Sequence, residues 1–139
     1  MKPLFICFLF IYTLQPKCQV EHSMEQVKDV FLDAIHLDVF AKEFKLCKLE
    51  CNQVNIFDYN NQIRDFPVST EICSKKVAVY NTTCVDHPTP SSIVVYKIEV
   101  TKEMIQIYFF RPYSGASIIF SYQVGGKKIK LQNTQIGTF

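Results

Sequence analysis

The apolar residues of this chain change their spacing once, near Pro67, and that change limits the fold class. Before Pro67 they recur at helical spacing, as in residues 24–35, which is typical of an amphipathic helix. After Pro67 they alternate with polar residues or form short β-branched runs, which is typical of strands. Helices followed by strands predict an α+β domain in which N-terminal helices pack on one face of a curved antiparallel sheet.

Three helices are expected in the first half of the chain. Residues 23–26 (SMEQ) have the form of a capping box and would begin the first. Asp38 would begin a second, short helix, and Asp58 a third. Pro67 would end the third helix, because the residue before a proline disfavours helical backbone. The segment between the second and third helices, residues 45–51 (KLCKLEC), alternates polar with apolar residues and is expected to be extended.

The second half predicts a sheet of four to six strands. Gly125 and Gly126 have the composition of a two-residue hairpin turn, after which a further strand would begin at Lys128. Four earlier segments are β-branched or alternate in polarity, at residues 72–80, 93–100, 105–110 and 118–124.

An apolar run at the N-terminus places the chain in the export pathway. Residues 4–14 (LFICFLFIYTL) follow Lys2 and precede Pro16. The run has the length of a signal-peptide core, whereas a membrane span needs about 20 apolar residues. We therefore expect residues 1–18 to be a signal peptide and residues 19–139 to be one secreted domain without a membrane span. A buried core segment and an uncleaved signal anchor are the alternatives.

Charge argues against nucleic acid as a partner. The chain has 15 basic and 13 acidic residues; without Lys2 and Lys17 of the leader it is formally neutral, and it has no basic tail. A small basic cluster, Lys127, Lys128 and Lys130, follows the glycine pair. It is either a contact for an anionic surface or charge that blocks pairing at an edge strand, and we favour the second interpretation.

Cysteine parity agrees with export. Two of the six cysteines fall in the leader, and the mature chain keeps four: Cys47, Cys51, Cys73 and Cys84. An even number in an exported chain predicts disulfides rather than a zinc site of four thiolates. Pairing Cys47 with Cys51 and Cys73 with Cys84 would close short loops. Crossed pairing would tie the segment after the helices to the first strand and stabilise the fold more, and we favour it.

A glycosylation signal also fits this compartment. Asn81 begins an Asn-Thr-Thr tripeptide beside Cys84, which is an acceptor pattern for N-linked glycan in secreted chains. We expect Asn81 to be glycosylated. An unmodified polar turn is the alternative.

The order of elements resembles the nuclear transport factor 2-like fold, a cone-shaped α+β roll. The segments that carry the resemblance are VKDVFLDAI (27–35), LDVFAKEF (37–44), KLCKLEC (45–51) and the strands from Ile72 onward. The resemblance implies a cone that encloses an open pocket or a filled core. A cystatin-like roll is the nearest competing fold. Its inhibitory Q-x-V-x-G hairpin is not matched, because Val124 directly follows Gln123.

Few residues point to catalysis. His36 lies near Asp33 and Asp38 and is a candidate general base. A histidine at the end of a helix more commonly interacts with the helix dipole. Enzymes of the resembling roll place an acid or a tyrosine inside the cone, and the candidates here are Tyr96, Tyr108 and Tyr122. No catalytic residue is assigned, and we expect neither a metal ion nor a cofactor.

These observations predict a secreted, non-enzymatic binding domain. Its ligand would be a small apolar molecule held in the cone or an extracellular protein held on the open sheet face. A small extracellular isomerase- or dehydratase-like enzyme and a cystatin-like protease inhibitor are the alternative functions. The bulky residues expected to line the core or cavity are Phe31, Phe40, Phe44, Phe66, Phe109, Phe110 and Phe120.

Overall fold

The computed structural model describes residues 17–63, 69–82, 85 and 87–138, with the backbone alone for residues 17–23. The core of the predicted signal peptide, Phe66 and Cys84 lie outside the described residues.

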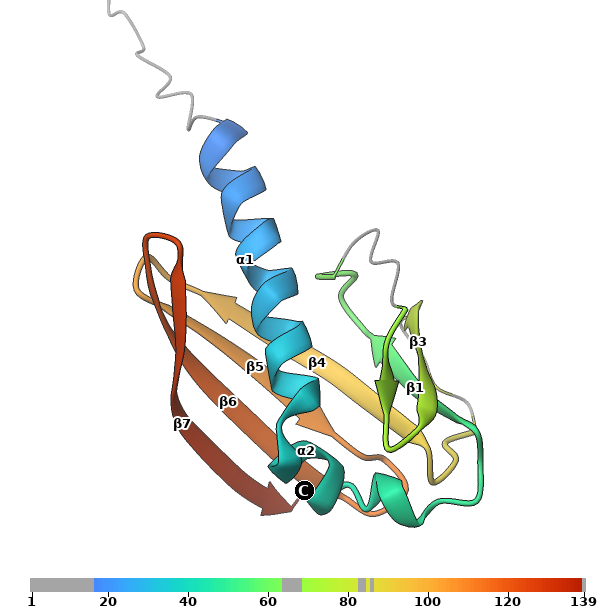
Figure 1. Ribbon diagram of the computed structural model, residues 1–139. Coiled ribbons are helices and arrows are strands. Elements are labelled where there is room, and N and C mark those ends of the chain that lie inside the picture. Colours follow the sequence, from blue (N-terminus) through green and yellow to red (C-terminus); the bar gives the residue numbers. More distant parts are fainter. Residues whose placement is uncertain (1–16, 64–68, 83–84, 86, 139) are drawn as a thin grey trace, which may run out of the picture.

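Two helices and one short 3-10 helix form the first part of the chain (Figure 1). Helix α1 spans Lys17–His36, α2 spans Asp38–Glu43 and η1 spans Leu46–Lys48. Helix α1 begins before the predicted capping box, so Ser23 lies within the helix. Residues 17–22 contain neither glycine nor proline to interrupt the helix.

The segment predicted to be extended, residues 45–51, contains η1 instead. Lys45 adopts a left-handed conformation, with φ 53°. That turn reverses the chain after α2 and lets Leu46 pack into the core beside Phe44, both with no exposed surface.

The sheet has seven strands and is mixed rather than antiparallel. The order across it is β2-β3-β1-β4-β5-β6-β7. Strand β1 is parallel to both of its neighbours, β3 and β4, and the other pairs are antiparallel. The strands are β1 Gln53–Asp58, β2 Glu71–Ile72, β3 Lys75–Asn81, β4 Ser92–Val100, β5 Met104–Phe110, β6 Ala116–Gly125 and β7 Lys128–Thr138.

The structure confirms the strands predicted at residues 93–100, 105–110 and 118–124, as β4, β5 and β6. The segment 72–80 is divided into β2 and β3, because Cys73 and Ser74 both take positive φ values, 52° and 59°. The hairpin after β6 forms, but its turn lies one residue later than predicted. Gly125 pairs with Lys128, and Gly126, with φ 60°, supplies the left-handed turn position.

The third helix predicted from Asp58 does not form over residues 58–63. Asp58 ends β1, and one of its carboxylate oxygens accepts a hydrogen bond from the backbone N–H of Ile63 at 2.6 Å. A helix N-cap bonds the N–H two or three residues later, whereas this bond spans five. The side chain therefore closes a turn, and residues 64–68 lie outside the described residues.

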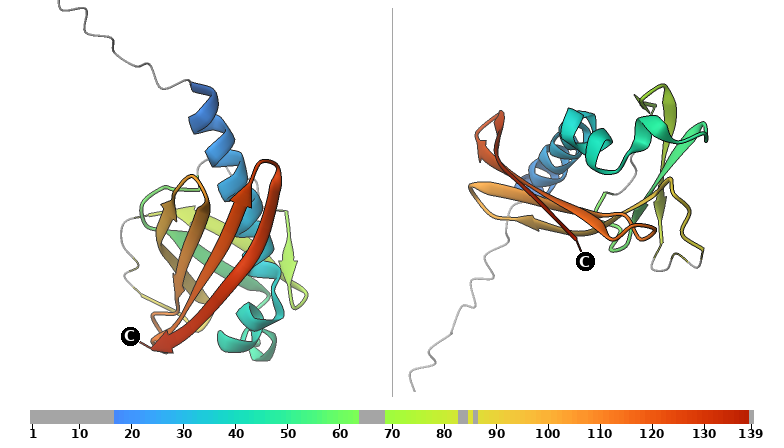
Figure 2. Two further views of the ribbon diagram at one scale, coloured as in Figure 1. Left: turned by 90° about the vertical axis from the view of Figure 1, so that its left-hand side faces the viewer. Right: turned by 90° about the horizontal axis from the view of Figure 1, so that it is seen from below.

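The sheet curls around the helices, which cover its concave face (Figure 2). Phe109 of β5 is central to the core: its ring centroid lies 6.1 Å from that of Phe31 on α1, 5.0 Å from Phe40 on α2 and 6.0 Å from Phe120 on β6. Phe40 also makes an edge-to-face contact with Phe44 at 5.0 Å. These five side chains have no exposed surface. Their rings therefore occupy the space between helices and sheet.

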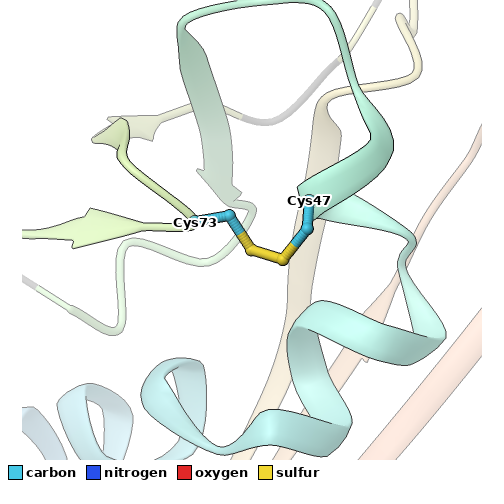
Figure 3. Close-up of a disulfide and its surroundings, with 2 residues drawn as sticks. All are labelled: Cys47 and Cys73. Atoms are coloured by element: carbon cyan, nitrogen blue, oxygen red, sulfur yellow. A yellow bond between two sulfur atoms is a disulfide. The ribbon is translucent and has the colours of Figure 1, made fainter.

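A disulfide joins Cys47 of η1 to Cys73 in the β2–β3 turn, with a Cα–Cα distance of 5.1 Å (Figure 3). This is a crossed pairing, and it excludes both the local Cys47–Cys51 pair and a zinc site that uses these two thiolates. Cys51 is an exposed free thiol in the structure. Its remaining candidate partner, Cys84, lies outside the described residues, so a second disulfide stays a prediction.

Removing the Cys47–Cys73 bond should lower stability substantially. The bond closes a loop of 26 residues, for which loop-closure entropy predicts a loss of about 3.5 kcal/mol in the free energy of unfolding. Urea denaturation of a Cys47→Ser, Cys73→Ser double variant measures the loss. Lys48→Ser, at the exposed neighbour of Cys47, is the matched control, with an expected change within about 0.5 kcal/mol. An equal loss in both proteins would contradict the pairing.

Candidate functional site

Of the three tyrosines predicted to point into the interior, Tyr122 is the one that is buried there. Tyr122 on β6 is 1% exposed, and its hydroxyl donates a hydrogen bond to a carboxylate oxygen of Asp33 at 2.7 Å. Burial of the ring, followed by this hydrogen bond, raises the pKa of Tyr122 above its ordinary value of 10.0. The hydroxyl is therefore a neutral donor that connects α1 to β6, rather than a base exposed to a substrate.

His36 lies at the end of α1 with both ring nitrogens engaged. Its Nδ1 is 2.7 Å from the carbonyl oxygen of Leu32, and its Nε2 is 2.7 Å from the hydroxyl of Thr70. A carbonyl oxygen only accepts, so Nδ1 carries a proton. The ring therefore ties the helix end to the residue before β2, which is a structural arrangement rather than that of a free general base.

A groove of about 530 Å³ lies beside His36, between the helix ends and β2. Buried Ile35 and Ile72 are among its lining residues. The charged residues around it have both signs: Asp38, Lys42, Lys45, Lys48 and Glu71. Such mixed charge does not select a ligand class.

Aromatic side chains gather on the convex face of the sheet, opposite the helices. We call this set the aromatic strip. It consists of Phe57 on β1, Tyr80 on β3, Tyr96 on β4, and Tyr108 and Phe110 on β5. Tyr80 is 44% exposed, and the other four are half-buried. The strip therefore presents aromatic surface to solvent across four adjacent strands.

Contacts within the aromatic strip divide it into two groups. Phe57 stacks on Tyr80 with ring centroids 5.4 Å apart. Tyr96 makes edge contacts with Tyr108 at 5.5 Å and with Phe110 at 5.6 Å. The strand register places Val94 between the groups, opposite Phe57 on one side and Phe110 on the other. Val94 itself has no exposed surface, so the strip consists of two neighbouring aromatic groups on the same face of the sheet.

A charged pair borders the strip. Lys97 and Glu99 form an ion pair, and the Tyr108 hydroxyl donates a hydrogen bond to Glu99 at 3.0 Å. The hydrogen bond from Lys97, and then that from Tyr108, lowers the pKa of Glu99, and the same ion pair raises the pKa of Lys97. The Lys97 ammonium also lies 5.4 Å from the centroid of the Tyr108 ring. Charge of both signs is thus held in place beside the aromatic surface.

Sequence reasoning placed three members of the strip wrongly. Tyr96 and Tyr108 were candidates for the interior, and Phe110 was expected to line the core. Adjacent strand residues point to opposite faces, so the buried position of Phe109 puts Tyr108 and Phe110 outside. Tyr96 follows buried Val95 and points outward for the same reason. In the sequence, the apolar residues Ile105, Ile107 and Phe109 at every second position indicated that these three point inward and Tyr108 outward, as the structure shows.

The other predicted site residues are at the surface. Asn81, the last residue of β3, is exposed, and its glycosylation stays a prediction. Lys127, Lys128 and Lys130 are exposed around the β6–β7 turn. Within the described part of the chain, no three His, Cys, Asp or Glu side chains are grouped to hold a metal ion. None of the described helices is long and apolar enough to cross a membrane.

No protein-family model matches the chain, and neither a curated protein nor a solved structure is significantly similar to it. The two helices within a curled sheet establish an α+β fold that is compatible with a cone-shaped roll.

We expect Tyr122→Phe to lower the free energy of unfolding by about 0.5–1.5 kcal/mol at neutral pH, because it removes the hydrogen bond to Asp33. The native pKa of Tyr122 is raised. Its contribution is therefore complete below about pH 10 and is lost as the pH rises further, where the unfolded chain releases the proton first. Urea denaturation at several pH values should show a steeper alkaline loss in the wild type than in the variant. Tyr113→Phe, at a tyrosine 61% exposed, is the control.

Proposed function

We propose that this protein is a secreted, non-enzymatic binding domain that holds an extracellular protein on its aromatic strip. The aromatic side chains on the convex sheet face, with Tyr80 exposed and the other four half-buried, carry this proposal. Tyrosine and phenylalanine are enriched at protein interfaces, and tyrosine supplies large contact area with few rotatable bonds. The Lys97–Glu99 pair at the border of the strip provides the polar rim that such interfaces have.

Three features support secretion. The apolar run at residues 4–14 has the composition of a signal-peptide core. The Cys47–Cys73 disulfide persists in oxidising compartments. Asn81, the acceptor of the Asn-Thr-Thr pattern, is exposed. Together they favour an extracellular partner over a cytosolic one.

The packing of the interior favours a protein partner over a small apolar ligand. Phe31, Phe40 and Phe109 have no exposed surface and contact one another where a ligand of the cone would lie. An isomerase-like enzyme would need Tyr122 or His36 available to a substrate, and both are engaged in hydrogen bonds. We also propose that the fold is a nuclear transport factor 2-like roll, on the order of its elements.

Substitution of the aromatic strip should weaken partner binding without unfolding the protein. We would combine Tyr80→Ser with Tyr108→Ser, one residue from each group of the strip. Proximity labelling of the extracellular proteome, followed by binding measurements with the recovered protein, should show affinity reduced at least about tenfold, a loss of about 1.4 kcal/mol. Tyr113→Ser, an exposed tyrosine on the β5–β6 turn, is the matched control and should bind as the wild type does.

Equal recovery of the same partners by all three proteins would contradict the use of this face. Native mass spectrometry of the secreted protein adds an independent readout. Retention of a lipid-sized passenger in wild type and strip variant alike would replace the protein-binding proposal with an apolar carrier.

A further inference from the structure

The two edges of the sheet differ in length and protection. At one edge, β2 has two residues and is joined through the Cys47–Cys73 disulfide to η1. At the other edge, β7 has 11 residues and, among the described strands, pairs only with β6. Figure 2 (left) shows β7 along the near edge of the sheet in full view. A long exposed edge strand is a template for pairing with another chain.

The first half of β7 carries features that oppose such pairing. Lys128 and Lys130 are exposed there. Tyr122 of β6 pairs with Leu131, and the preceding residue Ser121 pairs with Asn133. Gln132 therefore has no partner in β6 and forms a β-bulge. Charged side chains and bulges are devices that protect edge strands. These features therefore oppose pairing with another chain along residues 128–132 of β7.

The second half of β7, residues 133–138, has neither device. Its sequence, NTQIGT, contains no charge and no proline. All six of these residues are described, and they pair with β6 in unbroken register from Asn133 opposite Ser121 to Thr138 opposite Ala116. We call residues 133–138 the open edge.

Two backbone hydrogen bonds reveal which groups of β6 face each neighbour. The Ala116 carbonyl accepts from Arg111 at 2.8 Å, and the Val124 N–H donates to Glu103 at 2.8 Å, both toward the β5 side. Backbone groups of successive strand residues point to alternate sides. The even-numbered residues of β6 therefore face β5, and the odd-numbered ones face β7.

This alternation identifies the unpaired groups of β7. The odd-numbered residues of β6 lie opposite Asn133, Gln135 and Gly137, so the backbone groups of those three point toward β6. The N–H and C=O groups of Thr134, Ile136 and Thr138 consequently point outward along the open edge. Three evenly spaced residues present donors and acceptors, and Ile136 is the middle one.

Ile136 is also an exposed large apolar side chain, with 54% of its surface accessible. An antiparallel strand centred on Ile136 would place Ile136 opposite Ile136 of a second copy, and Thr134 opposite Thr138. Opposed residues in an antiparallel pair lie on the same face of the sheet, so the two isoleucines would contact each other. Lys128 and Lys130 fall outside the paired run, so like charges are kept apart.

We propose that the open edge is a self-association surface, on which a second copy of this chain pairs antiparallel about a two-fold axis at Ile136. The interface is isologous and closes at the dimer, joining two seven-stranded sheets into one. A single strand pair buries little surface, so the dimer belongs to the weak, transient class of assemblies. The proposal uses the sheet edge and is independent of the partner proposed for the aromatic strip.

Sedimentation equilibrium of the secreted protein, from about 1 to about 200 µM, covers the affinity range of weak interfaces. The wild type should show a monomer–dimer equilibrium. Ile136→Lys should raise the dissociation constant at least about tenfold, because two ammonium groups would oppose each other. Thr134→Pro should do the same by removing an outward N–H, which an edge strand tolerates. Gln123→Lys, with the same charge change at an exposed position of β6, should associate as the wild type does.

Amide hydrogen exchange by NMR provides a residue-level readout that does not depend on any variant folding. The amides of Thr134, Ile136 and Thr138 should exchange rapidly in dilute protein and slow as concentration rises. Those of Asn133 and Gln135, bonded to β6, should be protected throughout. A monomer at every concentration, a dimer unaffected by Ile136→Lys, or an open series of larger oligomers would overturn the proposal.

Discussion

The contact of Phe109 with three other rings is the interaction on which the arrangement of both sheet faces depends. It joins α1, α2 and β6 to β5 at ring separations of 5.0 to 6.1 Å. Once Phe109 points inward, the pleat of β5 determines the direction of every other residue on that strand. Cross-strand pairing carries the same direction to β6 and β7, since paired residues share a face. The outward position of Tyr108 follows from it, and so does the placement of Ile136 on the concave face, opposite Ile118.

Local sequence predicts the strands whose residues clearly alternate in polarity or are β-branched, and which are joined to their neighbours by short turns. β4, β5 and β6 have β-branched or alternating residues and are joined to one another by short turns, so neighbouring residues contain the information that specifies them. The same holds for the β6–β7 hairpin, where only the turn position was displaced by one residue. To determine which residues of these strands point inward, the inward position of Phe109 must also be known.

The elements that local sequence did not predict depend on distant contacts. β1 was not predicted: residues 53–57 were given no element, and Asp58, its last residue, was expected to begin a third helix. Its place is set by parallel pairing with β3 and β4, which no local pattern encodes. Asp58 has the chemistry of a helix cap, and it uses that chemistry to close a turn with Ile63 instead. The aromatic strip was missed for a related reason: an aromatic residue in a strand does not reveal which face it occupies.

The parallel placement of β1 also bears on the order in which the chain acquires its structure. Strands β4 to β7 pair with neighbours in sequence, so their contacts form with little loop closure. β1 pairs with residues 23 positions away in β3 (Gln53 with Lys76) and 37 away in β4 (Asn55 with Ser92). Such distant pairing is slow, because loop-closure entropy is lost before the contacts form. The Cys47–Cys73 bond joins a residue that precedes β1 in the sequence to one that lies just before β3. If it forms early in an oxidising compartment, it shortens the search by which β1 enters the centre of the sheet.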